Sequence, residues 1–278
     1  MLFGVNLMIK NSETKYSQEH KIYLKNRKKN ILKIKALQIG LLIILGTIWE
    51  ISAYFKWIDP FIVSSPSRIL KMLIILNSSG SLWYHTGITA FETIAGFFLG
   101  TIFGILFAVM IWWSDFLFKI IEPYLVVLNA LPKVAFGPII IIWMGAGMKS
   151  IILMALLVSV IIATINILSG FKNVSPEKII LMKSFGATKM QILSKLIIPA
   201  NIKNIISTLK INVGMSLIGV ITGEFLSSSK GIGYLIVYGG QVLKLDLVMT
   251  GIFILCIIAS IMYFLVAAFE SLYLKNRQ

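Results

Sequence analysis

Residues 171–203 read FKNVSPEKIILMKSFGATKMQILSKLIIPANIK and separate two long apolar runs of the chain. Within this segment Ser175 can cap a helix, Pro176 suits the first helical position, and Glu177 faces the positive end of the helix dipole. Gly186 predicts the end of this helix, because glycine readily adopts the left-handed conformation that commonly terminates helices. A first short helix is therefore expected between Ser175 and Gly186.

A second helix is predicted directly after this glycine. Thr188 and Gln191 have the T-x-x-Q spacing of a capping box, and Pro199 is expected to end the helix. Each helix has one apolar face, formed by Ile179, Ile180, Met182 and Phe185 in the first and by Ile192, Leu193, Leu196 and Ile197 in the second. Such a pair is either a docking element for another protein or an amphipathic pair lying among lipid headgroups. The residues alone leave both interpretations open.

The chain as a whole is too apolar for a soluble protein. Of its 278 residues, 58% are hydrophobic and 13% are charged, whereas soluble domains carry about 25% charged residues. Runs long enough to cross a bilayer as helices occur at residues 36–55, 85–113, 116–144, 151–168, 204–225 and 247–269. Pro123, Pro132 and Pro138 interrupt the third run and predict a broken span. The expected fold class is an all-α membrane protein with about six transmembrane helices.

Basic residues set the expected organisation and orientation. Most of the 26 Lys and Arg residues lie in the N-terminal tail, between the fourth and fifth runs, and after the sixth. Because cytoplasmic segments are enriched in Lys and Arg, both termini are predicted to be cytoplasmic. The predicted parts are a basic cytoplasmic tail at 1–35, a first transmembrane helix at 36–56, an extracytoplasmic segment with a short helix at 57–84, a core of five spans at 85–270 that includes the cytoplasmic loop 171–203, and a cytoplasmic tail at 271–278. No secretory signal peptide is expected, because no small-residue cleavage site closes the first run.

The composition also excludes several functional classes. Cys256 is the single cysteine, so neither an intramolecular disulfide nor a thiolate metal site is expected. His20 and His85 lie far apart and give no metal-binding spacing, and the sequence has no GxxxxGK[ST] loop for ATP. The net charge of +15 is interpreted as the cytoplasmic bias of Lys and Arg rather than as affinity for nucleic acid. No catalytic residue, metal or cofactor is predicted for the chain.

Four short motifs make the sequence recognisable. They are Gly186-Ala187-Thr188, the pattern Leu196-x-Ile198-Pro199, Gly223-Glu224-Phe225, and Gly231-Ile232-Gly233-Tyr234-Leu235-Ile236. These motifs resemble the permease subunits of bacterial ABC importers, in particular the nitrate, sulfonate and taurine branch. Ser65-Pro66-Ser67 and Ala130-Leu131-Pro132 also fit that branch, and the resemblance covers about residues 64 to 270. It implies the type I ABC importer permease fold with a cytoplasmic coupling-helix loop.

The loop motif of that family reads E-A-A, three residues, G, nine residues, I-x-L-P. Gly186 and Pro199 match it, whereas the E-A-A positions fall on residues 180–182 and the nearest acid is Glu177, three residues earlier. The loop residues for which the resemblance implies coupling to an ATPase are Glu177, Ile180, Met182, Gly186, Ala187, Thr188, Leu196 and Pro199.

The resemblance further implies a mechanism. Two copies of the permease pair, two ATP-binding subunits lie below them, and an extracytoplasmic binding protein delivers the solute. ATP is bound by those partner subunits, whose closure pushes the loop helices and tilts the spans. The chain is thus expected to be a transport subunit of a bacterial plasma membrane, without enzymatic activity of its own.

Several residues inside the spans have predicted roles. Gly96, Gly100 and Gly104 recur at four-residue spacing, which lets another helix approach closely. A charge at the bilayer centre costs about 2.5–3.5 kcal/mol on insertion scales, so each buried acid should face a partner, a cavity or the interface. Glu50 and Glu122 lie near predicted span ends, where solvated carboxylates are expected.

Two other charged residues are candidates for the translocation pathway. Glu92 lies one or two turns inside the second span and either pairs with another residue or contacts the solute. Lys133 follows Pro132, and its cation either attracts an anionic solute or extends along the kink toward the interface. Glu224 matches a family position near the outer end of the fifth span. It is expected to organise the segment that contains Gly231 and Gly233.

The predicted solute is a small anion such as an alkanesulfonate, taurine or nitrate. A thiamine-precursor pyrimidine is the alternative within the family, since similar permeases carry it. A proton-coupled secondary transporter using Glu92 or Glu224 is a third hypothesis, but the paired hydropathy repeats of such folds are not found. A membrane enzyme is disfavoured because the sequence offers no His or Asp cluster.

Overall fold

The computed structural model describes residues 18–275, and all regular elements in that range are helices. Five of these helices are long and apolar enough to cross a membrane: α2 (Gln18–Tyr54), α5 (Ser81–Trp112), α8 (Met148–Lys172), α11 (Ile198–Ser227) and α13 (Leu245–Lys275). A broken pair of helices makes up the sixth candidate span. The predicted all-α membrane fold with about six spans is confirmed. The predicted tail residues 1–17 and 276–278 lie outside the described residues.

The third predicted span is the broken one. Its elements are α6 (Asp115–Ala130), the short turn η1 (Lys133–Phe136) and α7 (Gly137–Met144). The two helical parts are bent by 89° relative to each other. Pro132 follows the end of α6, and Pro138 lies in the first turn of α7. Because proline cannot donate a backbone hydrogen bond but suits a helix start, this pair favours one helix ending and another beginning.

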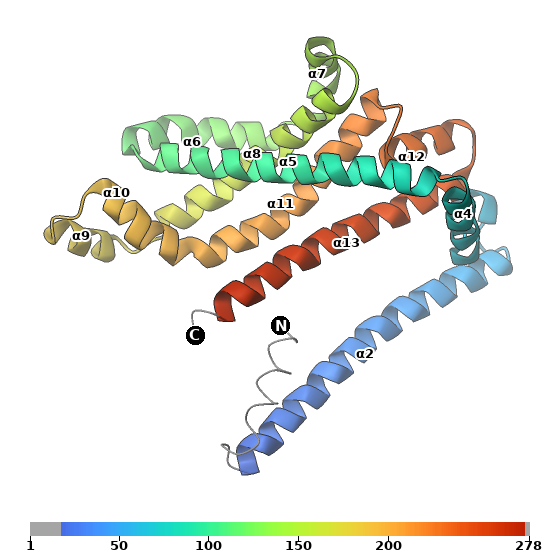
Figure 1. The fold of residues 1–278 in the computed structure, drawn as a ribbon, viewed down its shortest axis with the longest axis horizontal. Coiled ribbons are helices and arrows are strands. Elements are labelled where there is room, and N and C mark those ends of the chain that lie inside the picture. Colours follow the sequence, from blue (N-terminus) through green and yellow to red (C-terminus); the bar gives the residue numbers. More distant parts are fainter. Residues whose placement is uncertain (1–17, 276–278) are drawn as a thin grey trace.

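The core of the molecule consists of α5, α8 and α11, which lie side by side (Figure 1). Small residues allow this close contact. A Cβ atom built at Gly96 would lie 2.6 Å from the Cβ of Ala155, and one built at Gly104 would lie 2.5 Å from the Cβ of Ala163. Gly100 faces the same helix. The stripe of three glycines on α5 therefore lies against α8, where only small residues fit.

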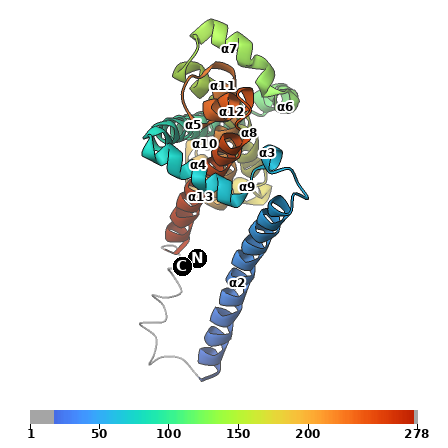
Figure 2. The same cartoon turned by 90° about the vertical axis from the view of Figure 1, so that its right-hand side faces the viewer.

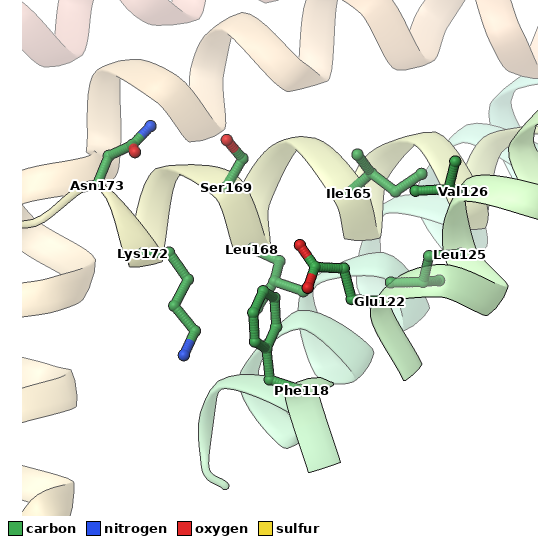
Figure 3. Close-up of a pocket in the computed structure, with 9 residues that line it drawn as sticks. All are labelled: Phe118, Glu122, Leu125, Val126, Ile165, Leu168, Ser169, Lys172 and Asn173. Carbon is green, nitrogen blue, oxygen red and sulfur yellow. The ribbon is translucent and has the colours of Figure 1, made fainter. Parts of the chain in front are cut away.

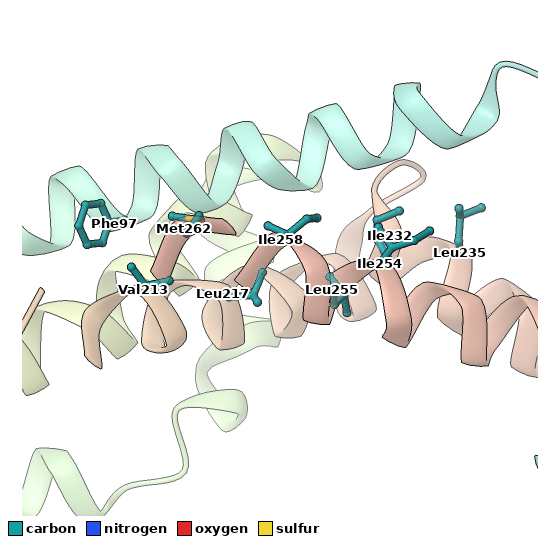
Figure 4. Close-up of a cluster of buried hydrophobic side chains, with 9 residues drawn as sticks. All are labelled: Phe97, Val213, Leu217, Ile232, Leu235, Ile254, Leu255, Ile258 and Met262. Atoms are coloured by element: carbon teal, nitrogen blue, oxygen red, sulfur yellow. The ribbon is translucent and has the colours of Figure 1, made fainter. Parts of the chain in front are cut away.

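α13 packs along another side of this core, together with α12 (Ile232–Gln241). Nine buried side chains from four helices meet there (Figure 4): Phe97, Val213, Leu217, Ile232, Leu235, Ile254, Leu255, Ile258 and Met262. Lipid tails are as apolar as these side chains, so close van der Waals packing is what stabilises the contact in a membrane.

Two short helices, α3 (Pro60–Val63) and α4 (Pro66–Ser78), lie at the same end of the bundle as α12 (Figure 1). Ser65 caps α4 as predicted, because its hydroxyl oxygen accepts the N–H of Arg68 at 3.5 Å. The Arg68 guanidinium forms a 2.7 Å ion pair with Asp246 of α13, and the Ser64 hydroxyl donates to the same carboxylate. These contacts fix α4 to the start of α13.

The first helix is longer than predicted. The sequence suggested a tail at 1–35 followed by a span at 36–56, whereas α2 is continuous from Gln18 to Tyr54. No glycine or proline occurs between residues 18 and 39, and Lys, Arg, Gln and Leu have high helix propensity, so nothing ends the helix where the charges begin. Figure 2 shows α2 standing apart from the other helices. Its end is tied to α4 by a 2.9 Å hydrogen bond from the Ser67 N–H to Glu50.

The prediction that Pro199 ends the second loop helix is wrong. The helix α10 (Lys189–Ile192) continues through a π-helical turn, η2 (Leu193–Ile197), directly into α11. The N–H of Ile198 bonds to the carbonyl oxygen of Leu193, five residues back, which is the π-helical pattern. Pro199 has no N–H to donate, and the widened turn just before it lets the chain remain helical.

Candidate functional site

The loop 171–203 lies at the end of the bundle opposite α4 and α12 (Figure 1). We refer to it as the loop end. Its first helix, α9 (Pro176–Ser184), stops at Gly186, which has a φ of +74°. The Gly186 N–H donates to the carbonyl oxygen of Lys183 at 2.9 Å, and the Ala187 N–H donates to that of Met182 at 3.0 Å. This is the Schellman pattern of helix termination, and it requires the left-handed glycine that the sequence predicted.

The chain then turns into α10 through the expected capping box. The hydroxyl oxygen of Thr188 accepts the N–H of Gln191 at 3.3 Å, and the side-chain oxygen of Gln191 accepts the N–H of Thr188 at 2.8 Å. At the start of α9, by contrast, the Ser175 hydroxyl caps no backbone group and donates to the carboxylate of Glu177. This hydrogen bond lowers the pKa of Glu177, which is exposed.

The sequence suggested that the apolar residues of α9 form one face, but in the structure they do not all lie on the same side of the helix. Ile179 and Met182 pack against the buried cluster that includes Phe171 and lies beneath the loop. Ile180 and Phe185 point outward instead, with 61% and 80% of their surface exposed. The difference arises because tertiary packing selects which part of a broad apolar stripe is covered.

Four large apolar side chains of the loop are thus exposed, and we call them the exposed apolar set: Ile180, Leu181, Phe185 and Met190. Of the other predicted coupling residues, Ala187 and Leu196 pack against the buried cluster, and Pro199 lies half-buried at the start of α11. The loop therefore has an inner side held by the bundle and an outer side that carries exposed apolar side chains next to the Gly186 turn. Apolar side chains exposed in this way favour contact with another protein or with lipid.

Cations attach the loop to the end of α5 and the start of α6. The Lys189 ammonium donates to the carbonyl oxygen of Trp113 and lies 5.9 Å from the ring centroid of Trp112. Lys172 forms a 2.6 Å ion pair with Asp115. Because these contacts join the loop to two further helices, a displacement of the loop also reaches α5 and α6.

A pocket of about 240 Å³ opens beside this ion pair, between α6 and α8 (Figure 3). Its lining residues are Phe118, Glu122, Leu125, Val126, Ile165, Leu168, Ser169, Lys172 and Asn173. Glu122 is exposed, in keeping with the solvated carboxylate expected at a span end. The Lys172 ammonium also lies 4.2 Å from the centroid of the Phe118 ring. The cation therefore already has a carboxylate partner and an aromatic one.

At the opposite end, Glu224 of α11 is 1% exposed and faces the start of α12. Its Oε1 accepts the hydroxyl of Thr89 at 2.6 Å, and its Oε2 accepts the N–H of Gly233 at 2.5 Å. A Cβ at Gly231, whose φ is +94°, would lie 2.2 Å from this carboxylate, and one at Gly233 would lie 2.7 Å from it. Both glycines therefore let the carboxylate reach the positive end of the α12 dipole.

The two candidate pathway residues occupy different surroundings. Glu92 is 2% exposed, and its carboxyl group interacts directly with that of Glu224. Lys133 lies half-buried in η1, where its ammonium donates to the carbonyl oxygen of Asn129. The structure thus joins Glu92 to the Glu224 network and places Lys133 at the bend of the broken span.

The sequence interpretation did not identify two residues of this network. Thr89 lies one turn before Glu92 on α5, and its hydroxyl oxygen also accepts the N–H of Ile232 at 2.7 Å. His85, a further turn back, accepts the N–H of Gly231 on its Nδ1 at 3.0 Å. The signal was present, because residues 85, 89 and 92 have the spacing of one helix face.

Comparisons with known proteins come from sequence and from structure. The family model described as "Binding-protein-dependent transport system inner membrane component" matches residues 100–275. A probable ABC transporter permease protein of Haemophilus influenzae is 30% identical over 234 residues, which are 84% of this chain and 95% of the relative.

Two relatives have more specific descriptions. The taurine transport system permease protein of Escherichia coli is 28% identical, over 80% of this chain and 83% of its own length. The formylaminopyrimidine transport permease protein of Halalkalibacterium halodurans is 29% identical, over 69% of this chain and 76% of its own length. Among solved structures, a bacterial ABC transporter involved in the import of the acidic polysaccharide alginate has a TM-score of 0.62 at 14% identity, covering 89% of this chain and 97% of that one. This structural likeness shows the fold.

Proposed function

The chain belongs to the family of inner membrane components of binding-protein-dependent transport systems, the permease subunits of ABC importers, and from this premise we propose how it is driven. The loop 171–203 receives force from a separate ATP-binding subunit. The observation that carries this proposal is the exposed apolar set beside the Schellman turn at Gly186. A rigid, capped helical turn with apolar side chains directed outward suits insertion into a cleft of another protein. ATP binds that partner, and this chain needs no cofactor.

Movement of the loop is transmitted in two ways. The uninterrupted path from α10 through η2 into α11 makes the loop a direct extension of a membrane span. Lys189 and Lys172 link the same loop to α5 and α6. Closure of the ATP-binding subunits would therefore tilt several spans together. Two copies of the permease, two ATP-binding subunits and an extracytoplasmic binding protein complete the proposed assembly.

The proposed orientation places the loop end and both termini in the cytoplasm. The support is the Lys- and Arg-rich composition of the first half of α2 and of the loop, together with Lys275 and Arg277 after the last apolar run. A cysteine at Lys189, in a chain with Cys256→Ser, is expected to resist a membrane-impermeant thiol reagent added outside whole cells. A cysteine at Lys230, near the start of α12, is expected to react readily.

Chains carrying Cys256→Ser alone serve as the background control for this labelling. Lysed cells should allow both introduced cysteines to react, which shows that protection at Lys189 comes from the membrane. The reverse labelling pattern in whole cells would overturn the orientation.

The proposed solute is a small anion of the alkanesulfonate, taurine or nitrate class, supported by the taurine permease relative. A thiamine-precursor pyrimidine is a second candidate, which the formylaminopyrimidine permease relative favours. Lys133 is the proposed anion-attracting residue of the pathway, and Glu92 is the other candidate pathway residue.

Reconstituted uptake distinguishes these solutes. Vesicles that hold the permease with its ATP-binding subunit and binding protein are expected to accumulate labelled taurine or alkanesulfonate when ATP is supplied inside. Lys133→Ala should reduce this uptake, while Lys230→Ala serves as a matched loss of one cation. Uptake of the pyrimidine in place of the anion would select the second candidate. Uptake that persists without ATP but follows a proton gradient would indicate a secondary transporter instead.

A further inference from the structure

The Glu224 carboxylate is a hydrogen-bond acceptor on both of its oxygens. Thr89 uses its oxygen to accept the N–H of Ile232, so its own proton points to Glu224 Oε1. The N–H of Gly233 points to Oε2. Donors on both oxygens, at the positive end of a helix, are the surroundings of an ionised carboxylate. These contacts favour the ionised form of Glu224 over that of its acidic neighbour Glu92.

Glu92 has the opposite surroundings. Its Oε2 is buried and has no hydrogen-bond donor within reach among the described residues. Its carboxyl group interacts with that of Glu224, which is already an acceptor on both oxygens. Two ionised carboxylates in contact, both removed from solvent and lacking a cation between them, would repel each other strongly.

The charged and titratable groups in the described part of the chain do not supply this missing donor, because Oε2 of Glu92 has no hydrogen-bond partner there. The two such groups toward the start of α12 have other contacts: His85 accepts the N–H of Gly231 on its Nδ1, and the Lys230 ammonium lies 5.9 Å from the ring centroid of Tyr84. A proton on Glu92 removes both problems at once, because it turns the unpartnered oxygen into a donor and leaves a single negative charge on the pair.

We propose that Glu92 carries a proton in the folded protein and donates it in a hydrogen bond to Glu224. Glu92 is then a positioning residue: through Glu224 it holds the start of α12 against α5 and α11. The inference concerns this pair alone and does not depend on the solute or on the loop. It also gives the acid a role other than direct contact with the solute.

Infrared spectroscopy of the purified full-length chain tests the proposal without any partner protein. At neutral pH the wild type should show the C=O stretching band of a buried protonated carboxylic acid, which shifts in D₂O. Glu92→Gln should remove this band, whereas Glu122→Gln, which alters an exposed carboxyl, should leave it unchanged. Absence of the band from the wild type would overturn the proposal. This result comes from the wild-type spectrum alone, so it does not depend on whether any variant folds.

Substitutions then separate the donor from the charge. Glu92→Gln keeps a donor of similar size, so the melting temperature of the purified chain should stay close to that of the wild type. Glu92→Leu removes the donor from the buried pair, so its melting temperature should fall clearly. If the band survives in Glu92→Gln but disappears in Glu224→Gln, the proton lies on Glu224 and the assignment is wrong. A melting temperature of Glu92→Gln as low as that of Glu92→Leu would also contradict it, since the donor would not be what matters.

Discussion

Replacing Gly186 by leucine is expected to abolish ATP-dependent uptake while leaving membrane insertion intact. The φ of Gly186 is +74°, and a left-handed conformation costs a residue with a side chain roughly 1–2 kcal/mol. No neighbouring atom blocks the site, since a Cβ there would meet nothing within 4 Å. The strain therefore acts on the turn itself, which sets how α9 presents the exposed apolar set.

Gly186→Asn is the matched control for this substitution. Asparagine tolerates the left-handed conformation better than leucine does, so this variant should keep most of the uptake. Insertion is measured by the amount of chain in isolated membranes, and coupling is measured by ATP-driven uptake in vesicles. Uptake at the wild-type level by Gly186→Leu would mean that the geometry of this turn does not matter for transport.

Gly104→Leu is expected to prevent the stable packing of the bundle. A Cβ at Gly104 would lie 2.5 Å from the Cβ of Ala163, which is attached directly to the α8 backbone and cannot rotate away. Overpacking of this kind costs typically about 1–3 kcal/mol, and here the two helices would have to move apart. We expect a clear fall in the melting temperature of the purified chain, or loss of monodisperse protein.

Gly87→Leu on the same helix separates this steric effect from a general effect of replacing glycine. A Cβ at Gly87 would have no neighbour within 4 Å, so the variant should be as stable as the wild type. Equal melting temperatures for the two leucine variants would show that α5 and α8 do not approach each other at the glycine stripe.

Local chemistry explains why much of the loop could be predicted from sequence. The Gly186 turn and the Thr188 capping box depend on residues within five positions of each other, and both are present. The prediction that Pro199 ends the second loop helix was wrong, because a π-helical turn just before it compensates for the missing N–H and no sequence rule signals such a turn. The length of α2 could not be predicted from its basic start, because charge indicates location relative to the membrane, not whether a helix continues.

The contacts that define the other end could not be predicted in the same way. Glu224 was expected to organise the glycine-rich segment, but Thr89, its hydroxyl donor, precedes it by 135 residues. Likewise, the sequence placed Ile180 and Phe185 on one face with Met182, and the structure covers only Met182. Which side of a short helix is buried depends on tertiary packing, about which the local pattern says little.

Force transfer from an ATP-binding subunit to residues 171–203 is tested most directly by cross-linking from Phe185. A chain with Phe185→Cys and Cys256→Ser is assembled with the ATP-binding subunit, treated with a short thiol-reactive cross-linker in the presence and absence of ATP, and analysed by mass spectrometry. We expect a cross-link to the ATP-binding subunit whose yield changes with nucleotide, and none from a cysteine at Lys230. The proposed coupling is contradicted if the Phe185→Cys chain forms no cross-link to the ATP-binding subunit in any nucleotide state and its cysteine reacts instead with a lipid-phase reagent.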